Sequence, residues 1–126
     1  MKANYIRISD KSQNTHVQQN DSDRLYVDFI TGKSKFASRP KAKELMRDIE
    51  SGLITQVTVH EISRLGRNLI DIISTLEWMH SKGVVIYVQN LELYSMEDGK
   101  ESPLFRAKIG KLANIAQTEL ESLRHK

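Results

Sequence analysis

The chain has 126 residues, a length typical of one domain with a modest hydrophobic core. Its net charge of +3 and its 28% of charged residues allow a polyanionic partner without requiring one. The sequence contains no cysteine, which excludes disulfides, thiolate catalysis and cysteine–zinc sites within it. No apolar run approaches the roughly 18 residues of a membrane span.

The first half of the chain alternates apolar segments with polar ones. In chain order, we predict a strand over 5–8, a polar loop over 10–23, a strand over 25–30, a basic loop over 31–38 and a helix from Pro40 to Gly52. The proline favours a helix start, because its missing N–H has no partner in a first turn. The glycine favours a helix end, where a left-handed residue commonly follows the last turn.

The second half continues this alternation. The predicted elements are a strand with Val57, Val59 and Ile62, a helix over 68–82, a strand over 84–88, an edge strand over 91–94, a loop over 96–103 and a long helix over 103–124. The segment 84–88 is continuously apolar, which indicates burial on both faces. Strands that alternate with helices predict an α/β fold with a largely parallel sheet.

Two short segments carry the functional signal. Residues 5–9 read Tyr-Ile-Arg-Ile-Ser, a strand that ends with a hydroxyl near a guanidinium, and residues 63–67 read Ser-Arg-Leu-Gly-Arg. Ser9 and Arg64 both follow predicted strands, and catalytic groups of parallel sheets gather at those ends. A serine among fixed positive charges can attack a phosphodiester, since the charges hold the phosphate and offset the developing negative charge.

Each of these residues also has an ordinary structural explanation. Ser9 fits a turn or cap residue, and Arg7 fits an ion pair with Asp28 or Glu61. Arg64 and the arginine at 67 fit solvated side chains on a loop. Against this, positive side chains at a helix start are unfavourable unless an anion binds there. The four histidines show no metal-binding spacing, so no metal site is predicted.

The two segments resemble the Y-x-R-x-S strand end and the D-R-L-G-R turn of the serine recombinases, the resolvase/invertase family. The similarity extends over residues 5–124, and includes an arginine before the next helix, a D-x-x-[ST]-G stretch over 28–32 and an A-x-x-E stretch over 116–119. It implies a catalytic set of Ser9, Arg7, Arg64, Arg67 and Arg39, and a substrate-positioning set of Tyr5, Gln13, Gln18, Asp28, Thr31 and Glu119.

The resemblance also implies a fold and an activity. We expect a resolvase-like three-layer α/β domain with a mostly parallel central sheet, formed by residues 1–101, and the start of a long oligomerisation helix over 102–126. Ser9 would cleave DNA through a 5′-phosphoserine intermediate and rejoin it, without a metal or other cofactor. The DNA-binding domain of the family is expected to be absent here, so this fragment alone is expected to be inactive.

The partners implied by the resemblance are double-stranded DNA and further copies of the chain, as a dimer that becomes a tetramer when two sites are joined. No membrane and no small-molecule substrate is expected. The location would be cytoplasmic, for a protein encoded by a prokaryote or by a mobile element. The apolar helix positions predicted for subunit contact are Phe105, Ile109, Leu112 and Ala116. The alternative is that this stripe packs on its own sheet.

One departure from the family pattern affects the activity. Ser63 stands where the family usually has aspartate, which removes a carboxylate beside Arg64. This departure leaves open a catalytically inactive resolvase-like module that assembles on DNA. A flavodoxin-like signalling domain is the other alternative.

Overall fold

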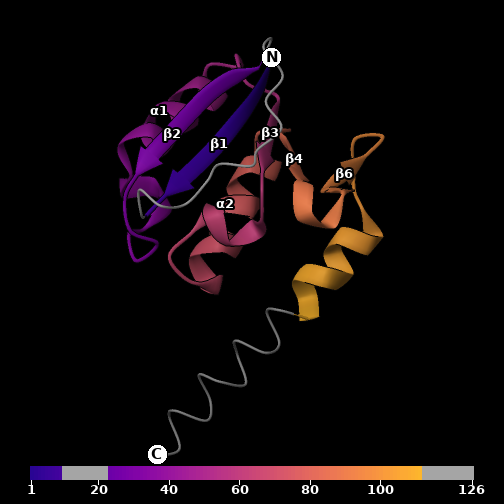
Figure 1. The fold of residues 1–126 in the computed structure, drawn as a ribbon. Helices are drawn as coiled ribbons and strands as arrows, with labels where there is room; N and C mark the ends of the chain where they lie inside the picture. The colour runs from indigo at the N-terminus through magenta and orange to yellow at the C-terminus, as the bar shows by residue number, and fades with distance from the viewer. Residues whose placement is uncertain (10–22, 112–126) are drawn as a thin grey trace, which may run out of the picture.

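A central five-stranded sheet organises the molecule in this computed structural model, which describes residues 1–9 and 23–111. The sheet has the order β2-β1-β3-β4-β5 (Figure 1). Its strands are β1 (Lys2–Ile8), β2 (Arg24–Phe29), β3 (Gln56–Val59), β4 (Val85–Val88) and β5 (Leu93–Tyr94). The first four strands of that order pair in parallel, and β5 adds an antiparallel edge.

The helices are α1 (Pro40–Glu50) and α2 (Leu69–Ser81), with short 3-10 turns η1 (Phe36–Ser38), η2 (Ile62–Leu65) and η3 (Gln89–Leu91). Helix α1 packs mainly against β2, and α2 packs against β4. Each helix buries one apolar stripe in the common core, with Leu45 and Ile49 from α1 and Leu76 and Met79 from α2. On the side of the sheet that faces the core, each strand contributes every second residue, because successive side chains of a strand point to opposite faces.

The register of β1 and β2 sets the position of the site. Arg7 lies opposite Asp28, and the backbone N–H of Ile30 continues the pairing to the carbonyl of Ile8. Both strands therefore end at the same edge of the sheet, beside the turn that follows β3. This edge carries Arg7 and Asp28, two of the side chains that the sequence marks as functional.

The predicted fold class is confirmed, while three local predictions are wrong. Ile62 lies in η2, so β3 already ends at Val59. Residues 96–103 are not simply a loop, because β6 (Met96–Glu97) and β7 (Lys100–Glu101) form a hairpin. The predicted strand over 84–88 is buried on one face only, since Val85 and Tyr87 are half-buried.

The predicted terminal helix begins as expected. The chain is helical from 103 through 111, and the part of the prediction over 112–124 lies outside the described residues. Within the described ranges, no helix has the length and apolar character needed to cross a membrane.

Candidate active site at the carboxyl ends of the strands

Arg7 lies at the end of β1 beneath the loop that follows β2. Its Nη1 donates to the carbonyl of Ile30 at 3.4 Å, and a Cβ at Gly32 would lie 3.3 Å from its Cζ. Glycine at position 32 therefore lets the backbone pass close to the guanidinium. Burial lowers the pKa of Arg7, and the positive charges of Arg64 and then Arg39 lower it further. Three guanidinium groups thus come together, and we call Arg7, Arg39 and Arg64 the arginine cluster.

Arg39 is the fully buried member of the arginine cluster. Its Nε donates to the carbonyl of Ser34 at 3.1 Å, and its Nη1 donates to the carbonyl of Arg64 at 2.7 Å and to the Tyr5 hydroxyl at 3.3 Å. Its Nη2 is buried and has no hydrogen-bond partner among the described residues. The side chain therefore joins the basic loop over 31–38 to the turn that carries Arg64.

Tyr5 and Asp28 form a buried pair behind the cluster. The Tyr5 hydroxyl donates to Asp28 Oδ2 at 2.9 Å, and burial raises the pKa of Tyr5, so the hydroxyl stays protonated. The Asp28 carboxylate also accepts from the backbone N–H groups of Lys41 at 2.8 Å and Ala42 at 3.0 Å. A carboxylate at the first turn of α1 satisfies unpaired N–H groups and opposes the positive helix end. Asp28 thus holds α1 against β2.

Arg64 is half-buried, like Arg7, and has a carboxylate partner. Its Nη1 lies 3.4 Å from Glu61 Oε1, and the Ser63 hydroxyl donates to the same oxygen at 2.7 Å. The η2 turn brings the two ends of this pair together, since the Arg64 N–H donates to the Glu61 carbonyl at 3.2 Å. Arg7 has no ion pair in the described part of the chain. The alternative prediction, an ion pair of Arg7 with Asp28 or Glu61, is therefore wrong.

Asp71 is a buried residue of this region that the sequence interpretation missed. Its Oδ2 accepts from the backbone N–H of Phe36 and from that of Arg67, both at 2.9 Å. It lies in the first turn of α2, where Asn68 Oδ1 caps the helix by accepting from the Asp71 N–H at 2.8 Å. Asp71, three positions after Asn68, is a helix-start signal that can be seen in the sequence. Its contact with Phe36 has no such sequence signal.

Gly66 allows the turn after η2 to approach α2 closely. A Cβ at this position would lie 2.6 Å from the backbone nitrogen of Ile72, a distance that real side chains do not occupy. Its backbone is extended, with φ of −177°, so glycine is needed here for space and not for a left-handed conformation. The close approach sets the spacing of Arg64 and Arg67 relative to α2.

The remaining predicted site residues are placed as follows. Ser9 is exposed directly after β1, and the Arg67 side chain is exposed on the turn before α2. Thr31 is exposed, and its Oγ1 accepts from the Lys33 N–H at 3.3 Å. Gln13, Gln18, Glu119, Leu112 and Ala116 lie outside the described residues. Across residues 1–9 and 23–111, no three metal-binding side chains come close enough to hold a metal ion.

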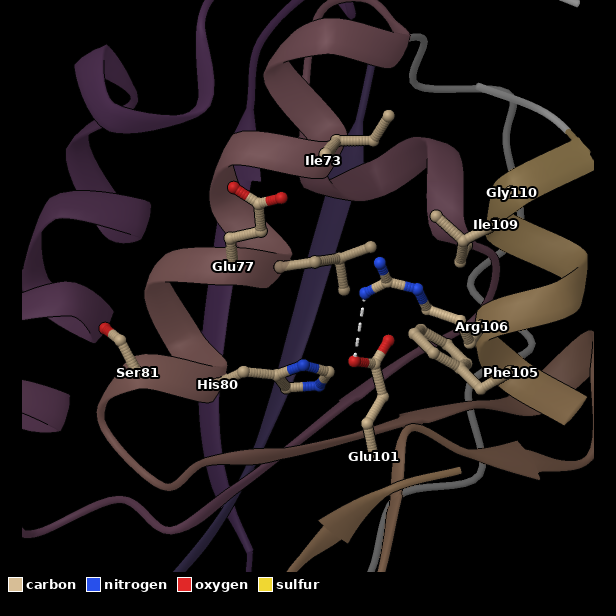
Figure 2. A pocket seen from close by; sticks show the side chains of 10 residues that line it. Ile73, Glu77, His80, Ser81, Glu101, Phe105, Arg106, Ile109 and Gly110 are labelled. Atoms are coloured by element: carbon tan, nitrogen blue, oxygen red, sulfur yellow. Dashed lines mark hydrogen bonds and ion pairs between the residues drawn. The ribbon is translucent and has the colours of Figure 1, made fainter. Parts of the chain in front are cut away.

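A separate cavity of about 500 Å³ lies between α2 and the terminal helix. Figure 2 shows His80 of α2 directed toward Glu101 and Phe105 at its wall. Phe105 is 1% exposed and Ile109 packs against the same core, so the beginning of the predicted subunit-contact stripe is covered by its own domain. Burial lowers the pKa of His80.

The sequence and the fold can now be compared with known proteins. The chain matches the family described as resolvase, N terminal domain, over residues 2–126. The transposon Tn501 resolvase of Pseudomonas aeruginosa is 26% identical over 124 residues, which cover 97% of this chain and 63% of that protein. The transposon Tn552 resolvase of Staphylococcus aureus is 32% identical over 90 residues, which cover 67% of this chain and 43% of that protein. The chain thus spans less than two thirds of these curated relatives.

Two solved structures have the same fold. The N-terminal catalytic domain of TP901-1 integrase has a TM-score of 0.70 at 19% identity, covering 96% of this chain and 98% of its own. A resolvase family site-specific recombinase from Streptococcus pneumoniae has a TM-score of 0.59 at 26% identity, covering 81% and 67%. These likenesses confirm the resolvase-like α/β fold, and the sequence match over nearly the whole length shows that the chain belongs to the resolvase N-terminal domain family.

Proposed function

We propose that this chain is the catalytic domain of a site-specific DNA recombinase, in which Ser9 is the nucleophile. The observation that carries the proposal is that Arg39 Nη1 donates both to the Arg64 carbonyl and to the hydroxyl of Tyr5, which lies two residues before Arg7 on β1. The three arginines therefore lie beside the end of the strand that Ser9 follows. Like charges repel one another, and an anion bound among them relieves that repulsion. A DNA phosphate is an anion of suitable charge for this position.

In the proposed reaction, Ser9 Oγ attacks a backbone phosphorus atom and forms a new O–P bond. The bond from phosphorus to the 3′ oxygen breaks. Ser9 loses its hydroxyl proton, and the 3′ oxygen gains one proton and becomes a 3′ hydroxyl. The phosphodiester energy is kept in the phosphoserine, so a 3′ hydroxyl of another strand can attack it and restore Ser9 without ATP. The cations favour the step because negative charge develops on the phosphoryl oxygens.

The members of the arginine cluster have different parts in this proposal. Arg7 and Arg64 are partly accessible and are proposed to contact the phosphate, together with the exposed Arg67. Arg39 is wholly buried, and its hydrogen bonds support a role in positioning Arg64 through its carbonyl. Tyr5 and Asp28 are proposed to support Arg39 and α1, which is a more structural role than direct contact with DNA.

The proposed partners are double-stranded DNA and further copies of the chain. Lys33 and Lys35 are exposed on the basic loop, and Gly32 of the same loop lies against the Arg7 guanidinium. The two lysines are therefore suited to contact neighbouring backbone phosphates. Such contacts position a protein on DNA, whereas base contacts select the sequence. We therefore propose that target choice depends on a DNA-binding domain and that this domain alone binds DNA weakly.

The test is to join the full 126-residue chain to a zinc-finger domain of known target sequence. The fusion is incubated with DNA in which paired zinc-finger sites flank a library of spacer sequences, and covalent protein–DNA products are trapped under denaturing conditions. We expect a product whose mass places the DNA on Ser9. Ser9→Ala should abolish it. Ser81→Ala, which removes an exposed hydroxyl at the far end of α2, should not.

Two results count against the proposed function. One is the absence of any covalent product from the wild-type fusion across the library, which favours the inactive DNA-assembly module. The other is an equal yield of product from Ser9→Ala and wild type, which assigns the nucleophile to another residue. The unfused chain serves as the control for the expected weakness of DNA binding by this domain alone.

A further inference from the structure

Glu61 is the carboxylate that faces the arginine cluster. Its Oε1 lies 3.4 Å from Arg64 Nη1 and accepts the Ser63 hydroxyl hydrogen bond at 2.7 Å. The pKa of Arg7 is lowered chiefly by burial, and the negative charge of Glu61 acts in the opposite direction. Glu61 is therefore close enough to influence two members of the cluster at once.

Among residues 1–9 and 23–111, two further carboxylates near the cluster are already occupied by backbone groups. Asp28 accepts from the first turn of α1 and from Tyr5, and Asp71 accepts from Phe36 and Arg67 N–H groups. In the described part of the chain, Glu61 is the one acidic side chain that forms an ion pair with an arginine of the cluster.

The Ser63 hydroxyl explains how Glu61 is held in this position. Ser63 and Arg64 are consecutive residues of η2, and both bind the same oxygen of Glu61. A hydroxyl donor keeps the carboxylate turned toward Arg64 and adds no charge of its own. Position 63 carries no carboxylate in this chain, and the negative charge beside Arg64 instead comes from Glu61, two residues earlier.

We propose that Glu61 is a positioning residue that occupies Arg64 until a DNA phosphate displaces it. The inference rests on the proposed recombinase function of the same site. A carboxylate and a phosphodiester each offer oxygens with one negative charge, so the exchange keeps the charge around Arg64 balanced. The Glu61 and Arg64 side chains are 37% and 21% exposed, which leaves the pair open to solvent and to an incoming phosphate.

The proposal separates anion affinity from reaction rate. Without the Glu61 charge, phosphate meets no competitor and should bind about fivefold tighter, near the upper limit for a partly exposed ion pair. The same change removes the contact that sets the Arg64 conformation when DNA arrives. Part of the DNA complexes then form with Arg64 poorly oriented, and a poorly oriented group lowers the rate of the chemical step. Glu61→Gln should therefore bind DNA at least as tightly as wild type and cleave it more slowly.

The first experiment uses the 126-residue chain and measures Arg64 by nitrogen-15 NMR of its guanidinium during titration with inorganic phosphate. Glu61→Gln should release the restricted rotation of the Arg64 guanidinium and tighten phosphate binding about fivefold. The double variant Glu61→Gln, Ser63→Asp returns one carboxylate to η2 and should restore both properties. Glu50→Gln removes the same charge from a similar ion pair with Lys82 and should change neither property.

The second experiment measures DNA affinity and single-turnover cleavage with the zinc-finger fusion. Glu61→Gln should reduce the cleavage rate without weakening DNA binding, and the double variant should recover the rate at an unchanged melting temperature. A merely structural role predicts loss of stability in step with loss of rate, and no recovery. Such a result would overturn the proposal.

The two arms distinguish the failure of the inference from the failure of the proposed function. If wild type forms no Ser9 adduct, the recombinase function fails, and the NMR and phosphate measurements still decide whether Glu61 occupies Arg64. If wild type forms the adduct and Glu61→Gln behaves like Glu50→Gln in every measurement, the function stands and the role of Glu61 is rejected.

Discussion

The Asp71 carboxylate accepts a hydrogen bond from the backbone N–H of Phe36 at 2.9 Å, across 35 residues of sequence. The same oxygen accepts from the N–H of Arg67, so one side chain joins the basic loop to the turn before α2. Asp71 is 8% exposed, and buried hydrogen bonds to a charged group are among the stronger ones in proteins. This contact fixes the two segments that border the arginine cluster.

Replacing Asp71 should loosen both segments. We expect Asp71→Ala to lower the free energy of unfolding by about 2–4 kcal/mol, since a buried N–H group of Phe36 and a partly buried N–H group of Arg67 lose their acceptor. Hydrogen exchange should speed up selectively at the amides of Phe36 and Arg67. Glu77→Ala, which removes an exposed carboxylate from the same helix, is the matched control and should leave both amides protected.

Gly66 provides a steric test of the same turn. Gly66→Ala should destabilise the fold by roughly 1–3 kcal/mol, because the new Cβ meets the Ile72 backbone and one segment must move. Gly110→Ala has open space around its Cβ and lies in a helix, so it should be neutral or stabilising. Equal melting temperatures for the two variants would contradict the close approach of the turn to α2.

Arg64 should contribute strongly to cleavage if the proposed function is correct. Arg64→Ala in the zinc-finger fusion is expected to slow Ser9 adduct formation by about 3 kcal/mol of activation free energy, roughly 150-fold, as for one lost oxyanion donor. Arg24→Ala removes an exposed arginine at the start of β2 and should have little effect. A rate unchanged by Arg64→Ala would remove this residue from the catalytic set.

His80 should make stability depend on pH in a defined window. Its folded-state pKa is lowered by burial, so the unfolded chain binds the proton more readily. Glu101, Glu77 and Arg106 are the charged groups that line the cavity with it. Stability should therefore be highest above about pH 6.5, the unfolded value, and should fall as the pH drops below it toward the lower folded-state pKa.

The measurement is the free energy of unfolding, obtained from urea denaturation at pH values between about 7.5 and 5.5. This range brackets the ordinary histidine pKa. His80→Gln should flatten the curve in this window, whereas His60→Gln should keep the wild-type slope. If His80→Gln and wild type have the same slope, the imidazole is not desolvated as the structure indicates.

Most of the fold was predictable because local patterns and tertiary packing agree. The apolar stripe of α2 gave its bounds to within one residue, and proline and glycine marked the ends of α1. The β6–β7 hairpin was missed because each strand has only two residues. Its turn, Asp98-Gly99 with φ of 52° and 78°, is nevertheless a known hairpin signal.

The candidate site was only partly predictable. Ser9, Arg7 and Arg64 could be placed at one edge, because parallel strands end together. The full burial of Arg39 could not be anticipated, since arginine is rarely buried and two of its three acceptors, on Tyr5 and Arg64, come from distant segments. Glu61 was considered only as a partner of Arg7, and the structure pairs it with Arg64.

The hydrogen bonds of Arg39 have a consequence for protein engineering. Because one buried guanidinium spans the carbonyls of Ser34 and Arg64, residues 31–39 and 61–67 form a single transferable unit. A chimaera that exchanges only one of these segments with a relative would place the Arg39 guanidinium against a segment from another protein, with its hydrogen bonds no longer matched. Grafting both together preserves the match, and offers a practical route to hybrid domains.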